Sequence, residues 1–168
     1  GEPLVTVWRS GKPVYRPDLH AEDPYRELPL LAGTYGPSVR SVIDLAHSHG
    51  VKVAALAGKA VHAQRHVANG FYVVIAQGYE AGGHTGEIAT MVLVPEVVDA
   101  IAPVPVLAAG GIGSGRQIAA AMSLGAQGAW LGSIWLTTAE SDSSPAVLQA
   151  YLDATSADTE RSRCYTGK

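Results

Sequence analysis

The stretch FYVVIAQGYEAGGHTG, residues 71–86, decides the fold. Its first part, Phe71 to Ala76, is an unbroken apolar run, and the rest is rich in glycine. A short strand that is apolar on both faces is typical of a parallel sheet covered by other layers. In such sheets the ligand-binding groups follow the carboxyl ends of the strands. The stretch therefore predicts a buried parallel strand that leads into a functional loop.

The same alternation continues on both sides of this stretch. Further apolar runs, each expected to form a strand, occupy residues 51–55, 104–108 and 128–131. Helical patterns are expected at 38–49, at 60–68, near 95–101, at 115–124 and at about 145–154. Strands that alternate with helices predict right-handed βαβ units and a parallel sheet. Residues 1–37 contain six prolines and are expected to be an irregular N-terminal segment.

Composition supports an α/β protein and excludes several other classes. Hydrophobic residues make up 47% and charged residues 16% of the 168 residues, against about 25% charged in an average domain. The net charge of −3 without a basic stripe argues against nucleic acid, and no apolar run approaches the roughly 20 residues of a membrane span. The lone cysteine, Cys164, gives no disulfide, which favours the cytoplasm. No linker is apparent, so residues 1–168 are interpreted as one domain. No metal site is expected.

His84 lies in the glycine-rich part of the first stretch. Gly82 and Gly83 let the backbone pass close to a flat ligand. They would place the imidazole at the end of the strand, within reach of a substrate carbon. Histidine takes up and releases protons near neutral pH, so we predict His84 as a general base. The alternative is a structural or capping histidine in a tight turn.

A second glycine-rich stretch, AAGGIGSG at residues 108–115, again stands between an expected strand and an expected helix. Its backbone N–H groups can face an anion at the start of that helix. A dinucleotide-binding fold would need an acidic ribose ligand after the next strand, but Leu131, Gly132 and Ser133 stand there. Two successive strand ends with phosphate donors match the phosphate site after strands 7 and 8 of a (β/α)8 barrel.

Together, residues 74–86, 105–115 and 125–133 closely resemble the nitronate monooxygenase family, formerly called 2-nitropropane dioxygenases. The elements EAGGH and AAGGI, in this order and spacing, carry a likeness that covers roughly residues 39–136. The resemblance implies the C-terminal part of a TIM (β/α)8 barrel. It also implies an FMN-dependent oxidoreductase that oxidises alkyl nitronates or nitroalkanes without a nicotinamide requirement.

The resemblance also implies roles for particular residues. His84 would be the base that removes the proton next to the nitro group, and Gln77, Gly82 and Gly83 would lie against the flavin and its ribityl chain. Trp130 replaces a smaller or polar residue of many family members, so only its backbone contact is carried over. The implied contacts of the phosphate end are Gly110, Gly111, Trp130, Leu131, Gly132 and Ser133.

Other interpretations stay open at this point. The chain also resembles flavin-dependent enoyl reductases and CoA-thioester oxidoreductases on the same scaffold, which would use NADH or NADPH. A closed barrel needs about 250 residues, so the chain is expected to be a fragment of a longer enzyme or a truncated, non-catalytic fragment that binds flavin or phosphate. Half a barrel leaves open sheet edges, so a homo-oligomer is possible. Four histidines, His47, His49, His62 and His66, are expected on solvated helix faces, Lys59 at the surface, and Glu80 as a brace of its own loop.

Overall fold

The computed structural model describes residues 37–162. The chain divides into two units, residues 1–42 and residues 43–168, and the whole sheet lies in the second unit. The predicted irregular segment lies outside the described residues, except that Pro37 is the first residue of helix α2 (Pro37–Ser48). Proline is tolerated at this position because the first N–H of a helix has no partner in the helix.

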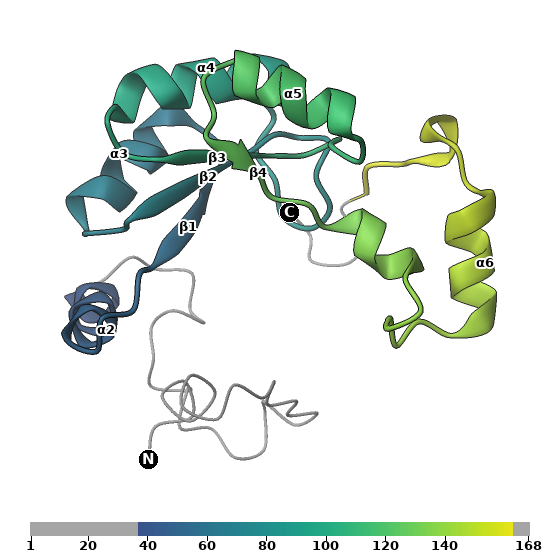
Figure 1. Ribbon diagram of the computed structural model, residues 1–168, viewed down its shortest axis with the longest axis horizontal. Coiled ribbons are helices and arrows are strands. Elements are labelled where there is room, and N and C mark those ends of the chain that lie inside the picture. The colour runs from purple at the N-terminus through teal and green to yellow at the C-terminus, as the bar shows by residue number, and fades with distance from the viewer. Residues whose placement is uncertain (1–36, 163–168) are drawn as a thin grey trace. The chain divides into compact units, whose positions relative to one another are not determined.

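Four parallel strands form one sheet in the order β1-β2-β3-β4 (Figure 1). Each strand is followed by a helix before the chain returns to the next strand, as right-handed βαβ units require. The strands are β1 (Ala54–Ala57), β2 (Val73–Gln77), β3 (Val106–Ala109) and β4 (Gly128–Ala129); the helices between them are α3 (Ala60–Ala68), α4 (Thr90–Ile101) and α5 (Gly115–Ser123).

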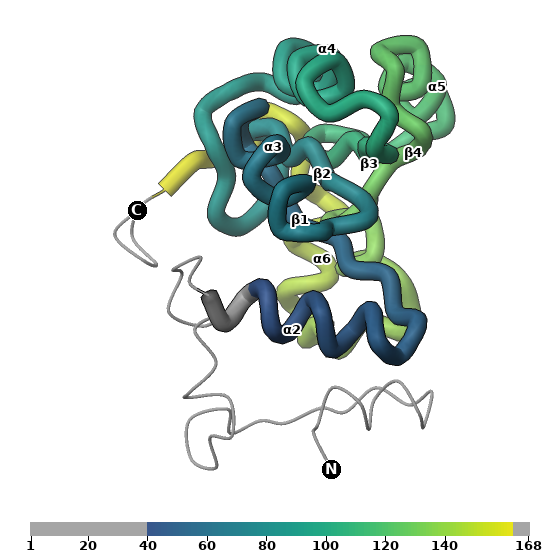
Figure 2. The backbone as a smooth tube through the Cα atoms, turned by 90° about the vertical axis from the view of Figure 1, so that its left-hand side faces the viewer, coloured from purple at the N-terminus to yellow at the C-terminus, as the bar shows by residue number. Residues whose placement is uncertain are grey.

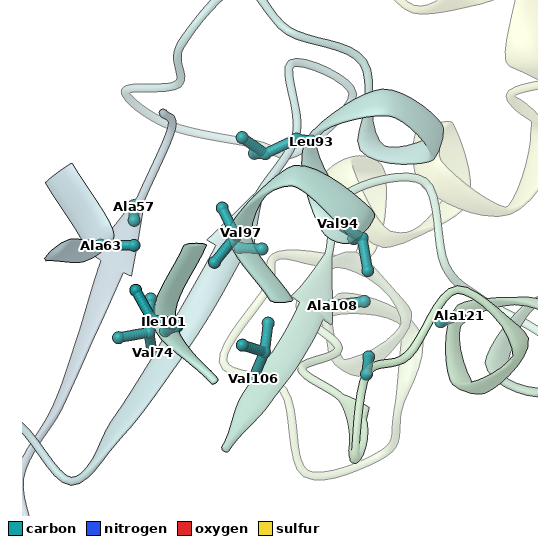
Figure 3. Close-up of a cluster of buried hydrophobic side chains, with 12 residues drawn as sticks. Ala57, Ala63, Val74, Leu93, Val94, Val97, Ile101, Val106, Ala108 and Ala121 are labelled. Atoms are coloured by element: carbon teal, nitrogen blue, oxygen red, sulfur yellow. The ribbon is translucent and has the colours of Figure 1, made fainter. Parts of the chain in front are cut away.

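All three of these helices lie on one face of the sheet (Figures 1 and 2). The residues of β2 and β3 that face them, Val74 with Ala76 and Val106 with Ala108, are fully buried. They pack against four buried residues of α4 in a single apolar cluster (Figure 3), namely Leu93, Val94, Val97 and Ile101. This packing fixes α4 over the centre of the sheet.

The opposite face of the sheet also carries apolar side chains. Leu56, Ile75 and Leu107 are paired in register on neighbouring strands, and they alternate with the residues that face the helices. Leu56, on the edge strand, is 50% exposed. A sheet with helices on one face and an apolar row on the other is the arrangement of a (β/α)8 barrel wall, whose second face points into the barrel.

The structure corrects several predicted boundaries. The largest correction concerns α4, which begins at Thr90 and not near Pro95, so Pro95 stands inside the helix. The buried residues Leu93 and Val94 hold this first part of the helix on the sheet despite the proline. Strand β1 starts at Ala54 and not at Val51, because its pairing with β2 begins at Ala54 and Val73.

The chain after β4 leaves the sheet. It forms the short 3-10 helix η1 (Ser133–Thr137), helix α6 (Pro145–Asp153) and the single turn η2 (Ser156–Asp158). The predicted helix at 145–154 is thus confirmed, whereas η1 was not predicted. No helix among residues 37–162 has the length and apolarity to cross a membrane.

Candidate active site

The predicted site residues meet at one edge of the sheet. The strand register aligns Ala57 of β1 with Ala76 of β2, Gln77 with Ala109 of β3, and Ala108 with Ala129 of β4. Because the strands are parallel, their carboxyl ends share this edge. Three segments that begin there carry the predicted residues: the loop 78–89, called the His84 loop below; residues 110–115, called the glycine turn; and residues 130–133.

The base of the His84 loop is closed by hydrogen bonds. The Tyr79 N–H donates to the Ile88 carbonyl at 2.9 Å. The Glu80 carboxylate accepts the Thr90 N–H through Oε2 at 2.9 Å, and Thr90 Oγ1 lies 2.8 Å from the same oxygen. Glu80 therefore supplies the cap that Ala89, the N-cap residue of α4, does not provide. The prediction that Glu80 braces its own loop is confirmed.

The tip of the loop carries His84, whose side chain is exposed. On one side of it, Gln77 Nε2 donates to the Gly82 carbonyl at 3.4 Å. Gly83 has a φ of 80°, a conformation that side chains disfavour. On the other side, Gly86 crosses the end of β1 so closely that a Cβ on Gly86 would lie 2.8 Å from the Gly58 carbonyl oxygen. The loop thus bends back over the neighbouring strand.

The glycine turn joins β3 to α5. Gly110 and Gly111 have φ angles of 107° and 67°, so both need glycine for the backbone conformation. Gln117 in α5 holds the turn: its Nε2 donates to the Gly111 carbonyl at 2.6 Å, and its Oε1 accepts the Gly113 N–H at 2.8 Å. Within residues 37–162 the N–H groups of Gly111 and Ile112 donate to no acceptor. These two groups can therefore bind an anion.

In the third segment, residues 130–133, one backbone donor is already used by the sheet. The Trp130 N–H donates to the Ala108 carbonyl at 2.8 Å, so the sheet already uses this group. The Trp130 side chain is 53% exposed. Leu131 is fixed through its carbonyl, which accepts from Trp135 Nε1 at 2.9 Å. Gly132 and Ser133 are exposed at the start of η1.

Three glycines at this edge, Gly82, Gly115 and Gly132, have no steric reason of their own within the described residues. A Cβ on any of the three would meet no atom within 4 Å, and none of them has a positive φ. By contrast, a Cβ on Gly78 would overlap Thr90. The space beside Gly82 and Gly132 is open, and the N–H groups of Gly111 and Ile112 lie at the same edge, so these residues place no obstacle to a flavin nucleotide. Among residues 37–162 no group of three His, Cys, Asp or Glu side chains is arranged to hold a metal ion.

Sequence reasoning misplaced His66. It is 1% exposed, and its Nε2 donates to the Leu56 carbonyl at 2.9 Å, so it is not on a solvated helix face. Its ring also meets Phe71 edge to face, with 5.1 Å between the ring centres. Burial lowers the pKa of His66, and the hydrogen bond to Leu56 opposes this shift in part. His66 therefore joins α3 to β1 as a neutral side chain. His47, His49 and His62 are exposed as predicted, and so is Lys59.

Comparison with known proteins identifies the family. A profile of the nitronate monooxygenase family matches residues 24–168. The chain belongs to this family. A protein from Staphylococcus haemolyticus that is named as a nitronate monooxygenase is 35% identical over 181 residues. The match covers 99% of this chain and 49% of that protein. Rv1533 of Mycobacterium tuberculosis, named as a monooxygenase, is 61% identical over 142 residues, or 84% of this chain and 38% of that protein.

Solved structures agree with this family assignment. Nitroalkane oxidase from Streptomyces ansochromogenes has a TM-score of 0.71 and 36% identity, and the match covers 77% of this chain and 40% of that one. FabK from Thermotoga maritima has a TM-score of 0.66 and 36% identity, over 69% of this chain and 37% of that one. The predicted family, its oxidoreductase class and the partial (β/α)8 barrel are confirmed. The chain spans less than half the length of these relatives.

Proposed function

We propose that the protein is an FMN-dependent nitronate monooxygenase with His84 as its base. The observation that supports this most is the place of His84. It lies at the tip of a loop held on both sides, at the sheet edge where the glycine turn presents the N–H groups of Gly111 and Ile112. One loop offers a proton acceptor and the next offers anion donors, as a flavin oxidoreductase of this family requires.

In this proposal the cofactor lies along the sheet edge. Gln77, Gly82 and Gly83 would contact the isoalloxazine and ribityl part, and Gly110 and Gly111 would hold the phosphate with Leu131, Gly132 and Ser133. Trp130 would lie beside the phosphate end through its backbone, although its N–H donates within the sheet. A bound flavin supplies the electron-accepting chemistry that no side chain of the protein can provide.

His84 would act on the proton of the substrate. A neutral nitroalkane carries an acidic proton on the carbon next to the nitro group, and the imidazole would accept this proton. A nitronate has already lost it, so the same side chain would then orient the anion. This difference makes the role of His84 measurable.

The experiment compares the two substrate forms in the purified protein loaded with FMN. Oxygen consumption without NADH is measured with a nitroalkane and with its preformed nitronate, for wild type and for His84→Asn. We expect the variant to lose about a hundredfold or more with the nitroalkane, the usual contribution of a general base, and much less with the nitronate. Equal losses on both substrates would contradict the role as base. If the protein retained neither FMN nor FAD after desalting, the proposed flavin cofactor would be contradicted.

The likeness to FabK supports a second candidate, an enoyl or CoA-thioester oxidoreductase on the same scaffold. Oxidation of NADH or NADPH that depends on an acyl thioester would favour it over the nitronate reaction. In both cases the partner is a small molecule. The single domain, the cytoplasmic location and a homo-oligomer stay predictions, as does the alternative of a truncated chain that binds phosphate without catalysis. In that last case His84→Asn would change nothing measurable.

A further inference from the structure

Arg161 lies far along the chain from the His84 loop and contacts it directly. Its Nη2 donates to Thr85 Oγ1 at 2.8 Å and to the Gly86 carbonyl at 2.7 Å. The guanidinium carbon lies 5.6 Å from the centre of the Tyr79 ring, near enough for a favourable contact with the ring face. Arg161 thus ties the segment after α6 to the loop that carries the candidate base.

The segment before Arg161 has a defined shape of its own. The N–H and the hydroxyl of Thr155 both donate to Asp158 Oδ2 at 2.7 Å, and Thr155 Oγ1 accepts the Ala157 N–H at 3.3 Å. These bonds form a reciprocal cap around η2. They hold the pKa of Asp158 below its usual value. The chain between α6 and Arg161 therefore contains a well-defined turn.

The contacts of Arg161 fall next to His84 in sequence. Gln77 holds the residue two places before it, Gly82, and Arg161 holds the two residues after it, Thr85 and Gly86. Between these points Gly83 gives the backbone unusual freedom. With both sides of His84 anchored, the backbone of the loop tip has few conformations open to it, which limits where the imidazole can lie. With only one side anchored, the tip of the loop would sample many backbone conformations.

We propose that Arg161 is a positioning residue for His84. It holds Thr85 and Gly86 so that the imidazole stays aligned with the substrate, without touching the substrate itself. The proposal rests on the proposed function, because it takes His84 as the base. The competing role for Arg161 is direct binding of an anionic substrate, and the test separates the two.

The chemistry of the contact defines the variants. Both short hydrogen bonds come from one nitrogen of Arg161. Lysine also carries all its donors on one nitrogen, so Arg161→Lys keeps the required donors although its side chain is one bond shorter. Glutamine is too short to reach. Thr85→Val removes the side-chain acceptor of the loop, leaves the Gly86 carbonyl as an acceptor and keeps the shape of the side chain. The matched control for the loss of charge is Arg65→Gln, because Arg65 is an exposed arginine of α3.

The first measurement is backbone hydrogen exchange, which needs neither cofactor nor activity. We expect Arg161→Gln and Thr85→Val to raise exchange in residues 78–89 and to leave β2 unchanged, with Arg161→Lys between them and wild type. Unchanged exchange in residues 78–89 for both variants would overturn the proposal. Arg65→Gln should match wild type.

The second measurement is steady-state turnover of the nitroalkane. Misplacing the base should lower kcat by about ten- to a hundredfold with little change in KM. In a double-mutant cycle the losses of Arg161→Gln and Thr85→Val should be far from additive, because each removes the same contact. The competing role is tested with the preformed nitronate, which is the anion. If Arg161→Gln raised only the KM for the nitronate and Thr85→Val were unaffected, Arg161 would bind the anion and the positioning role would be overturned. An inactive wild type would instead defeat the proposed function, and the exchange data would still decide whether Arg161 orders the loop.

Discussion

The carboxylate of Glu80 caps α4 from ten residues away, because its Oε2 accepts the Thr90 N–H at 2.9 Å. The Thr90 hydroxyl has a single proton and three acceptors in reach: Glu80 Oε2 at 2.8 Å, the Gly110 carbonyl at 3.0 Å and the Ala109 carbonyl at 3.3 Å. Glu80 and Thr90 together therefore join the His84 loop, the first turn of α4 and the glycine turn at one point.

Removing the charge of Glu80 should loosen this junction. Glu80→Gln keeps the size of the side chain but turns a charged acceptor into a neutral one, with an NH2 group that cannot accept from Thr90. We expect a loss of about 1 kcal/mol in the free energy of unfolding, the usual effect of losing a helix cap. Urea denaturation measures it. Glu96→Gln, an exposed position on the same helix, is the control and should change stability little. Equal effects at both positions would mean that the cap contributes nothing specific.

Gln117 should matter for the phosphate and not for the ring of the flavin. Its side chain fixes both sides of the glycine turn through Gly111 and Gly113. Gln117→Ala should therefore weaken FMN binding about tenfold, the effect of one or two lost hydrogen bonds. Riboflavin, which lacks the phosphate, should bind to the variant as it binds to wild type. Fluorescence titration with both ligands tests this, and a parallel loss for riboflavin would place the effect elsewhere. Gln64→Ala in α3 is the control substitution.

The sequence predicts what is local and misses what is brought together by folding. The strand Val73–Gln77 and its glycine-rich loop were visible because apolar runs and glycines mark strands and turns. The start of α4 was missed because its cap, Glu80, lies ten residues upstream and Pro95 looks like a helix start. Arg161 was missed because its contact with Thr85 spans 76 residues. No periodic pattern records such contacts.

His66 shows the same limit for a single residue. Its spacing from His62, one helical turn earlier, gave no sign of which histidine would be buried. The difference follows from how α3 lies on β1, where His66 reaches the Leu56 carbonyl and His62 remains exposed. A polar residue on a short helix is assigned to the solvent by default, and only the packed structure shows that its partner is a backbone carbonyl.

Burial of His66 should make stability depend on pH. The pKa of His66 is lowered in the folded protein from its ordinary value of 6.5, so below that value the unfolded chain binds more protons. The contribution of His66 is therefore complete above pH 6.5 and is lost as the pH falls through the folded pKa. Each pH unit in that window costs at most about 1.4 kcal/mol. His66→Gln, which cannot titrate, should be less stable than wild type at pH 8 but should lose less on acidification. Identical pH slopes would show that other groups cause the dependence.

Gly78 and Gly82 form a matched pair that separates packing from ligand binding. A Cβ on Gly78 would lie 2.5 Å from the Thr90 nitrogen, so Gly78→Ala should destabilise the protein by about 1–3 kcal/mol through overpacking. A Cβ on Gly82 meets no atom within 4 Å, so Gly82→Ala should change the free energy of unfolding by less than about 0.5 kcal/mol. If the flavin lies against Gly82, this variant should nevertheless bind FMN at least about tenfold more weakly. Thermal unfolding without ligand and FMN titration measure the two effects. Unchanged FMN affinity in Gly82→Ala would remove Gly82 from the cofactor site, because the methyl group would then point into solvent in the loaded protein too.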